Sequence, residues 1–370
     1  MSNKVTVVGA GNGGMTAAYH FAKQGHDVVL YDSPDFPAQI EAVQNNGGIK
    51  ALGEVHGCSM ILEGFEDDIV ATTDAGVAAS AAEILVMVCP SFAQEILFRQ
   101  LLPHLHDGQV LLLMPGNYGG LVLDRVRREV RPELDLTFAD AISIPWATRI
   151  HEPGVLTIMG IKEFLPLSIY PRVKATAEVK DLIEGTLPIP VEFLDNPIQA
   201  GLENINFGGH PLLTTLNMGL LENFGGKFTY YRDCCSTATA NACAHMDKER
   251  LSVGAAYGFK LRTELEAMNA LYAMDSKSVY ELNRGSVTHG KIDSAPSSSK
   301  HRYITEDVPY LMVPCYELAT LAGLKVPVVE SCIHIASAYN DEDYFTTGRT
   351  LEKMGLGDMT VEQIDQAMEG

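Results

Sequence analysis

A glycine-rich turn near the start of the chain could hold the phosphates of a dinucleotide. Gly9, Gly11 and Gly14 in "GAGNGG" directly follow a β-branched run and open an alanine-rich helical pattern. In such a GxGxxG turn, the first glycine permits a tight turn, the second lets the backbone approach a pyrophosphate, and the third lets helix and strand pack closely. The helix N-terminus adds the positive end of its dipole. The predicted cofactor-binding residues of this turn are Gly9, Gly11, Asn12, Gly13 and Gly14.

A carboxylate at the end of the next predicted strand bears on which dinucleotide is bound. Asp32 follows Gly14 at close to the spacing expected of a group that hydrogen-bonds the adenosine ribose. A carboxylate there repels a 2′-phosphate, and no arginine follows it in "YDSPDF". Asp32 therefore predicts NAD(H) as the preferred cofactor, with NADP(H) as the alternative.

The stretch "NFGGHP" at residues 206–211 contains the best candidate for a proton donor, His210. Gly208 and Gly209 are expected to end one helix, and Pro211 suits the first position of the next. This predicts an imidazole at or just before a helix N-terminus, in a rigid position that faces outward. The alternative is a structural turn in which the histidine has no chemical role.

An acidic segment further along the chain could complete such a site. A helix N-terminus disfavours the imidazolium and lowers its pKa, so a general acid there would need a carboxylate partner. "TEDVP" at residues 305–309 offers Asp307 or Glu306. Helix capping, with Thr305 as the cap and a carboxylate in the first turn, explains the same residues without catalysis.

Composition restricts the partners of the chain. Its 370 residues are 46% hydrophobic and 20% charged, which fits two globular domains. With 27 basic and 47 acidic residues, the net charge of −20 argues against nucleic acid or an anionic membrane surface as a partner. The seven cysteines form no CxxC pair, and the histidines and cysteines lack zinc-site spacing. We expect reduced, packed thiols and no metal.

The N-terminal residues lead directly into a strand pattern, without a basic and apolar leader. The longest apolar runs, such as "GQVLLLM" at residues 108–114, have the length of a strand and are too short to span a bilayer. We therefore expect a soluble, cytoplasmic protein that does not enter membranes.

The first half of the chain alternates predicted strands and helices. Predicted helices over residues 14–24 and 91–102 separate apolar strands, and two further strands are expected to extend the same sheet as far as about residue 190. Alternation of this kind predicts a Rossmann-type, doubly wound parallel sheet covered on both faces. The predicted strands span residues 4–8, 27–32, 82–90, 109–116, 134–143 and 154–162.

The second half is predicted to be all-α. Three prolines in "GTLPIPVEFLDNP" at residues 185–197 indicate an interdomain connection, and helical periodicity follows, including long stretches over about 236–257 and 260–274. We expect a dinucleotide-binding domain over residues 1–188 and a helical substrate and catalytic domain over residues 189–370. A polar segment at residues 290–309 is either a solvated loop or a border of the ligand site.

Several blocks of the chain together resemble the opine dehydrogenases, the octopine and nopaline dehydrogenase type. "VVGAGNGGMTAA" is generic, whereas "GLENINFGGHPLLTTLNMG" at residues 201–219, paired with "RYITEDVPYLMVP" at residues 302–314, is specific. The resemblance implies that His210 is the proton donor and Asp307 its carboxylate partner. "NFGGH" departs from the family's commoner apolar residues before the histidine, which leaves the shape of the pocket open.

The resemblance also implies a reaction and its substrates. Opine dehydrogenases condense the amine of an amino acid with an α-keto acid, often pyruvate, and reduce the imine with a reduced nicotinamide cofactor. The implied product is an N-(carboxyalkyl) amino acid. The chemistry of the residues agrees, because an electrophilic imine carbon must accept hydride while a nearby imidazole manages protons.

Three further residues are candidates for substrate binding. Arg302 could make a bidentate contact with the keto-acid carboxylate, or lie exposed on the surface. Asn206 could hydrogen-bond substrate or cap a helix, and Arg149 in "PWATRI" is a weaker candidate for the same cleft. Which arginine would hold the carboxylate stays open.

Two other functions remain as alternatives, and a homodimer is a possible assembly. Two-domain keto or hydroxy acid reductases of the ketopantoate reductase or glycerol-3-phosphate dehydrogenase type share this layout, but they use a lysine at the start of the helical domain. No lysine lies between Lys180 and Lys227. A non-enzymatic NAD(H)-binding redox sensor would need a nucleic-acid or partner surface, which the acidic charge disfavours. A homodimer is a candidate assembly, although no continuous apolar stripe marks an interface.

Overall fold

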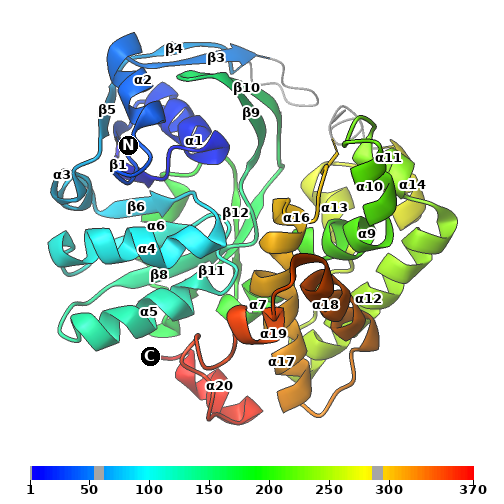
Figure 1. Ribbon diagram of the computed structural model, residues 1–370. Coiled ribbons are helices and arrows are strands. Elements are labelled where there is room, and N and C mark those ends of the chain that lie inside the picture. The colour runs from blue at the N-terminus through cyan, green and yellow to red at the C-terminus, as the bar shows by residue number, and fades with distance from the viewer. Residues whose placement is uncertain (1, 54–61, 286–294) are drawn as a thin grey trace. The chain divides into compact units, whose positions relative to one another are not determined.

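The computed structural model describes residues 2–53, 62–285 and 295–370 and divides the chain into two compact units (Figure 1). Unit 1 contains residues 1–200 and 368–370, and unit 2 contains residues 201–367. Unit 1 is built on two β-sheets, and the described part of unit 2 contains helices without a sheet. The expected order, an α/β dinucleotide-type fold followed by a helical region, is confirmed.

The larger sheet of unit 1 has the strand order β12-β11-β8-β7-β6-β1-β2-β5. Every neighbouring pair is parallel except β11 and β8, which are antiparallel. The central strands are buried along their whole length, which explains their continuous apolar sequences. Its strands are β1 (Lys4–Val8), β2 (Asp27–Tyr31), β5 (Ile69–Thr72), β6 (Ile84–Met87), β7 (Val110–Leu113), β8 (Thr137–Ala141), β11 (Leu165–Tyr170) and β12 (Val191–Leu194).

A second sheet corrects one expectation. The strand predicted over residues 154–162 does not extend the larger sheet; as β10, it pairs with β3 in parallel and with β9 in antiparallel fashion. Buried and partly exposed residues alternate along β10, the pattern of a strand that buries one face, not of a central parallel strand. The second sheet has the order β4-β3-β10-β9, with β3 (Ile49–Gly53), β4 (Gly64–Glu66), β9 (Trp146–Glu152) and β10 (Val155–Ile161).

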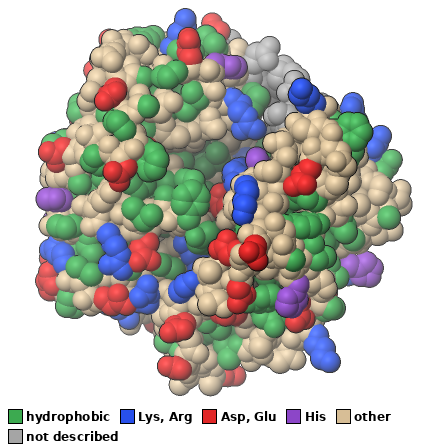
Figure 2. Space-filling view, viewed as in Figure 1, with side chains coloured by type: hydrophobic (Ala, Val, Ile, Leu, Met, Phe, Trp, Pro, Cys, Tyr) green, Lys and Arg blue, Asp and Glu red, His purple; other side chains and the backbone are tan. Residues whose placement is uncertain are grey.

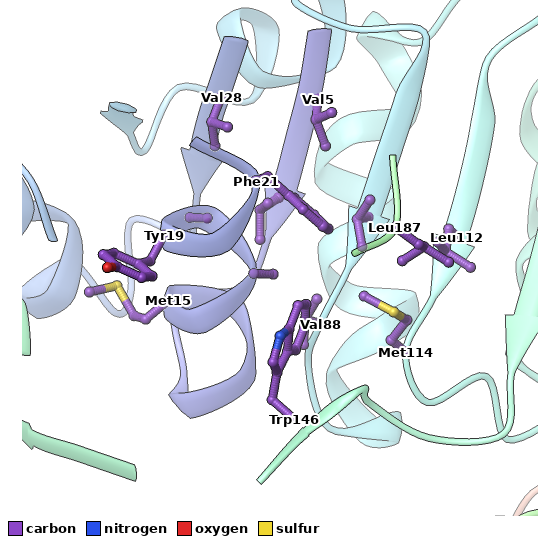
Figure 3. Packing of buried hydrophobic residues seen from close by; sticks show 14 of the residues in the cluster. Val5, Met15, Tyr19, Phe21, Val28, Val88, Leu112, Met114, Trp146 and Leu187 are labelled. Carbon is purple, nitrogen blue, oxygen red and sulfur yellow. The ribbon is translucent and has the colours of Figure 1, made fainter. Parts of the chain in front are cut away.

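The first helix, α1 (Asn12–Lys23), packs against strands of both sheets. Figure 3 shows the apolar core around it, where the Phe21 and Trp146 rings meet edge-on at 6.1 Å. Burying α1 on two sides fixes the turn that precedes it. The other helices of this part of the chain are α2 (Ala38–Asn46), α3 (Ala75–Ser80), α4 (Ser91–Leu101), α5 (Gly119–Val130), α6 (Ala177–Glu184) and α7 (Pro197–Leu202).

Unit 2 is organised around its longest described helix, α12 (Thr237–Ala256). Ser236 and Thr239 form a capping box at its start, and buried residues recur every three or four positions along it. The remaining elements are α8 (Asn206–Gly209), α9 (Pro211–Leu216), α10 (Met218–Asn223), α11 (Tyr230–Cys234), α13 (Glu264–Leu271), α14 (Val279–Gly285), α16 (Arg302–Thr305), the π-helix η3 (Val308–Met312), α17 (Val313–Leu321), α18 (Pro327–Asn340), α19 (Tyr344–Thr347) and α20 (Val361–Ala367).

Side chains of both charges are scattered over the visible surface (Figure 2). The six cysteines within the described residues are buried and form no disulfide with one another, as a packing role predicts. In the same part of the chain, no helix is long and apolar enough to cross a bilayer, and no group of three or more His, Cys, Asp or Glu side chains is arranged to hold a metal ion.

Candidate active site

The predicted break in the helical region lies at His210. Helix α8 ends at Gly209, His210 is the N-cap residue of α9, and Pro211 occupies the first turn of that helix. The proline suits this place because the first helical N–H groups have no partner within the helix. The expectation that the imidazole faces outward is wrong, since His210 is only 5% exposed.

The buried imidazole is paired with the predicted carboxylate. His210 Nδ1 lies 2.7 Å from Asp307 Oδ2, although the two residues are far apart in the sequence. Asp307 precedes η3 and makes no side-chain capping hydrogen bond, so capping does not account for it. Its second oxygen, Oδ1, has no hydrogen-bond partner within the described residues. The carboxylate is therefore directed at the histidine and not at a helix terminus.

Burial dominates the electrostatics of this pair. It lowers the pKa of His210 well below its ordinary value, an effect that the positive charge of Arg302 increases and Glu306 opposes. Burial also raises the pKa of Asp307 to about 7, against the attraction of Arg302. Since the two groups share a hydrogen bond, they titrate as a coupled pair. A proton exchanged near neutral pH is what acid–base catalysis requires.

Tyrosines surround the remaining surface of the imidazole. The Tyr231 hydroxyl lies 2.9 Å from His210 Nε2. The Tyr303 ring stacks on the imidazole, with 3.6 Å between centroids and 12° between planes. Tyr230 hydrogen-bonds the backbone oxygen of His210 at 3.1 Å and the Thr214 hydroxyl at 2.7 Å. These contacts leave the ring one fixed orientation.

The doubled glycine before His210 has a steric explanation at its first position. A β-carbon on Gly208 would come within 2.5 Å of Glu264 Cδ and Oε2. Glu264 is 5% exposed, and its Oε2 has no hydrogen-bond partner in the described part of the chain. Burial raises the pKa of this carboxyl to about 8, with a further contribution from Asp247. Glu264 therefore fills the space that a larger residue at position 208 would need.

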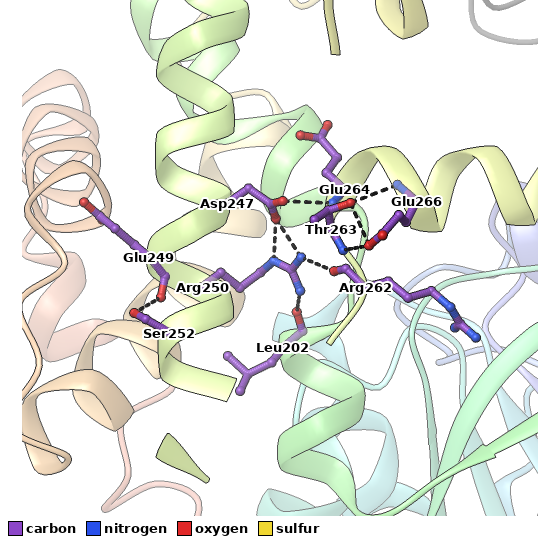
Figure 4. Close-up of polar contacts among 9 residues, drawn as sticks. All are labelled: Leu202, Asp247, Glu249, Arg250, Ser252, Arg262, Thr263, Glu264 and Glu266. Atoms are coloured by element: carbon purple, nitrogen blue, oxygen red, sulfur yellow. Dashed lines mark hydrogen bonds and ion pairs between the residues drawn. The ribbon is translucent and has the colours of Figure 1, made fainter. Parts of the chain in front are cut away.

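Figure 4 shows why Glu264 stays apart from the neighbouring arginine. Arg250 donates to Asp247 Oδ1 through Nε and Nη2, and to the backbone oxygens of Leu202 and Arg262. The Glu264 backbone N–H donates to Asp247 Oδ2, while its side chain points away from this network. The guanidinium is thus already engaged, and the Glu264 carboxyl is left against the His210 turn.

Arg302 and Asn206 lie in the same unit as the His210–Asp307 pair. Arg302 begins α16 with a side chain that is 55% exposed, and its Nη1 lies 3.6 Å from Glu306 Oε2. Asn206 begins α8, but the N-cap position belongs to Ile205, so Asn206 does not cap that helix. Its backbone oxygen accepts the His210 N–H at 3.2 Å.

The glycines of the N-terminal turn have the geometry that a dinucleotide requires. Gly9 has a φ of +101°, where a side chain would be strained, and a β-carbon on Gly14 would lie 1.7 Å from the Gly9 oxygen. A β-carbon on Gly11 would meet no atom within 4 Å, which leaves the backbone open to a ligand. Gly11 is also the N-cap residue of α1. The residues present therefore fit a bound pyrophosphate.

Asp32 is held against the same turn. Its Oδ2 accepts the Ala10 N–H at 2.7 Å, and its Oδ1 accepts the Ser33 N–H at 2.8 Å. The two bonds fix the carboxylate at the end of β2, beside the glycine turn.

The smaller sheet contacts this turn through β9. Asn12 Oδ1 accepts the Ile150 N–H at 2.7 Å, and the Thr16 and Thr148 hydroxyls lie 2.7 Å apart. The Asn12 side chain thus secures the turn to β9. Arg149 is exposed on that strand and belongs to unit 1, whereas Arg302 belongs to unit 2.

Sequence reasoning overlooked Tyr231, Tyr303 and Glu264 as neighbours of the histidine. Tyr303 stands within the resembling block at residues 302–314, so its position was a signal, whereas Tyr231 lies outside the two blocks that are specific to the resemblance. Glu264 is the first residue of α13, directly after the N-cap Thr263, where an acidic residue is expected for local reasons alone. Only the tertiary structure brings its side chain to Gly208.

Comparison with known proteins agrees with the two parts of the fold. Residues 193–340 match a family model described as the NAD/NADP octopine/nopaline dehydrogenase alpha-helical domain. Residues 4–116 match one described as the NAD-dependent glycerol-3-phosphate dehydrogenase N-terminus. The opine dehydrogenase of Arthrobacter sp. (strain 1C) is 28% identical over 370 residues, which cover 100% of this chain and 99% of that protein. The chain is similar to opine dehydrogenases over its whole length, and the helical-domain match and this relative together support that family for it. It is an NAD(P)-dependent oxidoreductase.

Solved structures of this family share the fold along almost the whole length. An octopine dehydrogenase structure described with NADH and L-arginine has a TM-score of 0.76 and 20% identity, covering 98% of each chain. A yersinopine dehydrogenase described with NADP+ has a TM-score of 0.72 and 14% identity, covering 100% of this chain and 98% of that one. The glycerol-3-phosphate dehydrogenase match, by contrast, stops at residue 116, before the helical region.

Proposed function

We propose that this opine dehydrogenase condenses the amine of an amino acid with an α-keto acid, pyruvate in the first instance, and reduces the resulting imine to an N-(carboxyalkyl) amino acid. The reverse oxidation follows from the same chemistry. The observation that carries the proposal is the buried His210–Asp307 hydrogen bond of 2.7 Å within the region that matches the octopine/nopaline dehydrogenase helical domain. Octopine dehydrogenase structures described with L-arginine and with pyruvate support the substrate classes.

In this proposal His210 is the proton donor, and Asp307 orients the imidazole and favours its protonated form. Attack of the amine on the keto carbon gives a carbinolamine, and its hydroxyl must be protonated before it leaves as water. The bound nicotinamide cofactor supplies the hydride that reduces the imine carbon. Asp307 favours the imidazolium by accepting a hydrogen bond from Nδ1–H, whereas the burial of the ring opposes the charged form.

We assign the substrate carboxylates to arginine. Arg302 has an exposed guanidinium one helical turn before Glu306 and near the His210 pair, which supports a bidentate contact to the keto acid. Asn206, one turn before His210, is the proposed hydrogen-bonding partner of the substrate, and Arg149 is the second candidate for a carboxylate.

We propose residues 1–188 as the dinucleotide-binding domain and residues 189–370 as the helical substrate and catalytic domain. Gly9, Gly11, Asn12, Gly13 and Gly14 would form the phosphate turn, with Asp32 at the ribose. The fixed carboxylate of Asp32 supports NAD(H) over NADP(H), since it would repel a 2′-phosphate. The Michaelis constants for NADH and NADPH test the preference, and tighter use of NADPH would reject it.

The reaction itself is tested by NADH oxidation with pyruvate plus a panel of amino acids, compared with pyruvate alone. Amine-dependent oxidation and an N-(carboxyalkyl) amino acid detected by mass spectrometry are expected. Equal rates with and without amines would reject imine reduction and favour a keto acid reductase instead.

We also propose a cytoplasmic location and a homodimer. The described cysteines are buried and form no disulfide with one another, which is compatible with a reducing compartment. Light scattering after gel filtration tests the assembly, and a monomeric mass would reject the dimer.

A further inference from the structure

Tyr231 occupies the nitrogen of His210 that would otherwise deliver a proton to substrate. Nδ1 is engaged by Asp307 Oδ2 at 2.7 Å, and Nε2 is engaged by the Tyr231 hydroxyl at 2.9 Å. An imidazole exchanges protons only through these two atoms. In this arrangement, neither atom is open to a substrate.

The imidazole is also covered on one face and buried as a whole. Tyr303 stacks on one face at 3.6 Å, and His210 as a whole is 5% exposed. Tyr231 is itself packed edge-on against Tyr230, with ring centroids 4.9 Å apart, which holds its hydroxyl in place. A proton leaving Nε2 therefore meets the Tyr231 oxygen first.

We propose that Tyr231 relays the proton between His210 and the carbinolamine, an inference that rests on the proposed function. As the imidazolium gives its Nε2 proton to Tyr231 Oη, the original Tyr231 O–H proton passes to the hydroxyl oxygen of the carbinolamine. The C–O bond breaks with its electron pair on that oxygen, water leaves, and the nitrogen lone pair forms the C=N bond. His210 ends neutral, Tyr231 is unchanged, and one proton is consumed.

A relay through a neutral tyrosine also suits its surroundings. Burial raises the pKa of Tyr231 well above its ordinary value, and the neighbouring Tyr303 and Tyr230 act in the same direction. A free tyrosinate is therefore disfavoured, and the two proton movements must be concerted. The same high pKa keeps the hydroxyl protonated and able to donate to Nε2 at rest.

Tyr231→Phe removes the relay oxygen, and Tyr230→Phe is the matched control. Tyr230 is adjacent and buried, but its hydroxyl contacts the His210 backbone oxygen and Thr214, and not the imidazole nitrogens. For Tyr231→Phe we expect kcat to fall by about 10²-fold with KM changed only a few-fold. For Tyr230→Phe we expect a lower Tm and a much smaller loss of kcat. A Tyr231→Phe kcat within about threefold of wild type would overturn the relay.

A measurement on the wild-type enzyme makes the test independent of variant folding. Two protons moving in one step predict a curved dependence of kcat on the deuterium fraction of the solvent. A linear dependence with a normal isotope effect on kcat would show one moving proton and overturn the relay. Amine-dependent turnover of the wild type separates the two hypotheses: its absence rejects the proposed reaction, whereas its persistence in Tyr231→Phe rejects the relay alone.

Discussion

The His210 imidazole is fixed by two hydrogen bonds and one stacked ring, all from residues of unit 2. These partners are distant from His210 in the sequence, and only the fold brings them next to the ring. The sequence identified His210 from the helix break and Asp307 from the resemblance. It could not place Tyr231 or Glu264, because their contacts depend on how α11 and α13 pack.

Replacing His210 tests the proton donor directly. We expect His210→Ala to lower kcat by about 10²–10⁴-fold, since the source of the proton for the leaving hydroxyl is lost. NADH affinity, measured by fluorescence titration, should change little. His245→Ala, at an exposed position of α12, is the control and should keep its turnover. Near-normal turnover of His210→Ala would make the histidine a structural residue.

Glu264 should make stability depend on pH. Its folded-state pKa of about 8 lies above its ordinary 4.5, so its stabilising contribution is complete below pH 4.5 and is lost as the pH rises through about 8. Relative to wild type, Glu264→Gln should therefore gain about 1.4 kcal/mol in unfolding free energy per pH unit between about pH 5 and 8. Urea unfolding measures the difference, with exposed Glu222→Gln as control. A difference independent of pH would contradict the assignment.

At the scale of elements, the sequence correctly predicted those turns and helix ends that depend only on neighbouring residues. The turn before α1 and the break between α8 and α9 follow from glycine and proline chemistry. The sheet that contains β10 did not follow, since strand pairing is decided by distant partners. The same holds for the contact between α8 and α13 at Gly208.

Gly208→Ala tests that contact. The added β-carbon must displace the Glu264 carboxyl, so we expect a loss of about 1–3 kcal/mol in unfolding free energy. Gly219→Ala in α10 meets nothing within 4 Å and should instead stabilise by about 0.5–1 kcal/mol through helix propensity. Thermal unfolding compares the two. Equal effects of both substitutions would show that position 208 is not sterically restricted.

At the scale of the whole molecule, composition and alternation predicted an α/β region followed by helices, and that order is confirmed. Composition and alternation could not predict the antiparallel pairing of β11 with β8 or the second sheet. Neither feature changes the composition of the chain or the number of its apolar runs. The acidic net charge of −20 leaves the binding of anionic ligands to local groups, such as the N-terminus of α1.

Cofactor binding should stabilise the molecule by mass action. At a free NADH concentration of 100 times Kd, we expect about 2.7 kcal/mol of stabilisation and a higher Tm for the transition in which unit 1 unfolds. Gly11→Ala should leave the Tm of the free protein nearly unchanged, because its β-carbon meets no protein atom, and should reduce the shift caused by NADH. If NADH raised the Tm of Gly11→Ala as much as that of wild type, the cofactor phosphates would not bind at this turn.

The contact between Gly208 and Glu264 also constrains how the sequence can diverge. Two positions that compete for one volume cannot enlarge independently, so substitutions at them should be correlated among homologues. Where a relative has an apolar side chain in place of Gly208, the residue that aligns with Glu264 should be short. An alignment of the family would then display the packing of α8 on α13 as covariation, and the departure of "NFGGH" from the commoner pattern would have its counterpart at position 264.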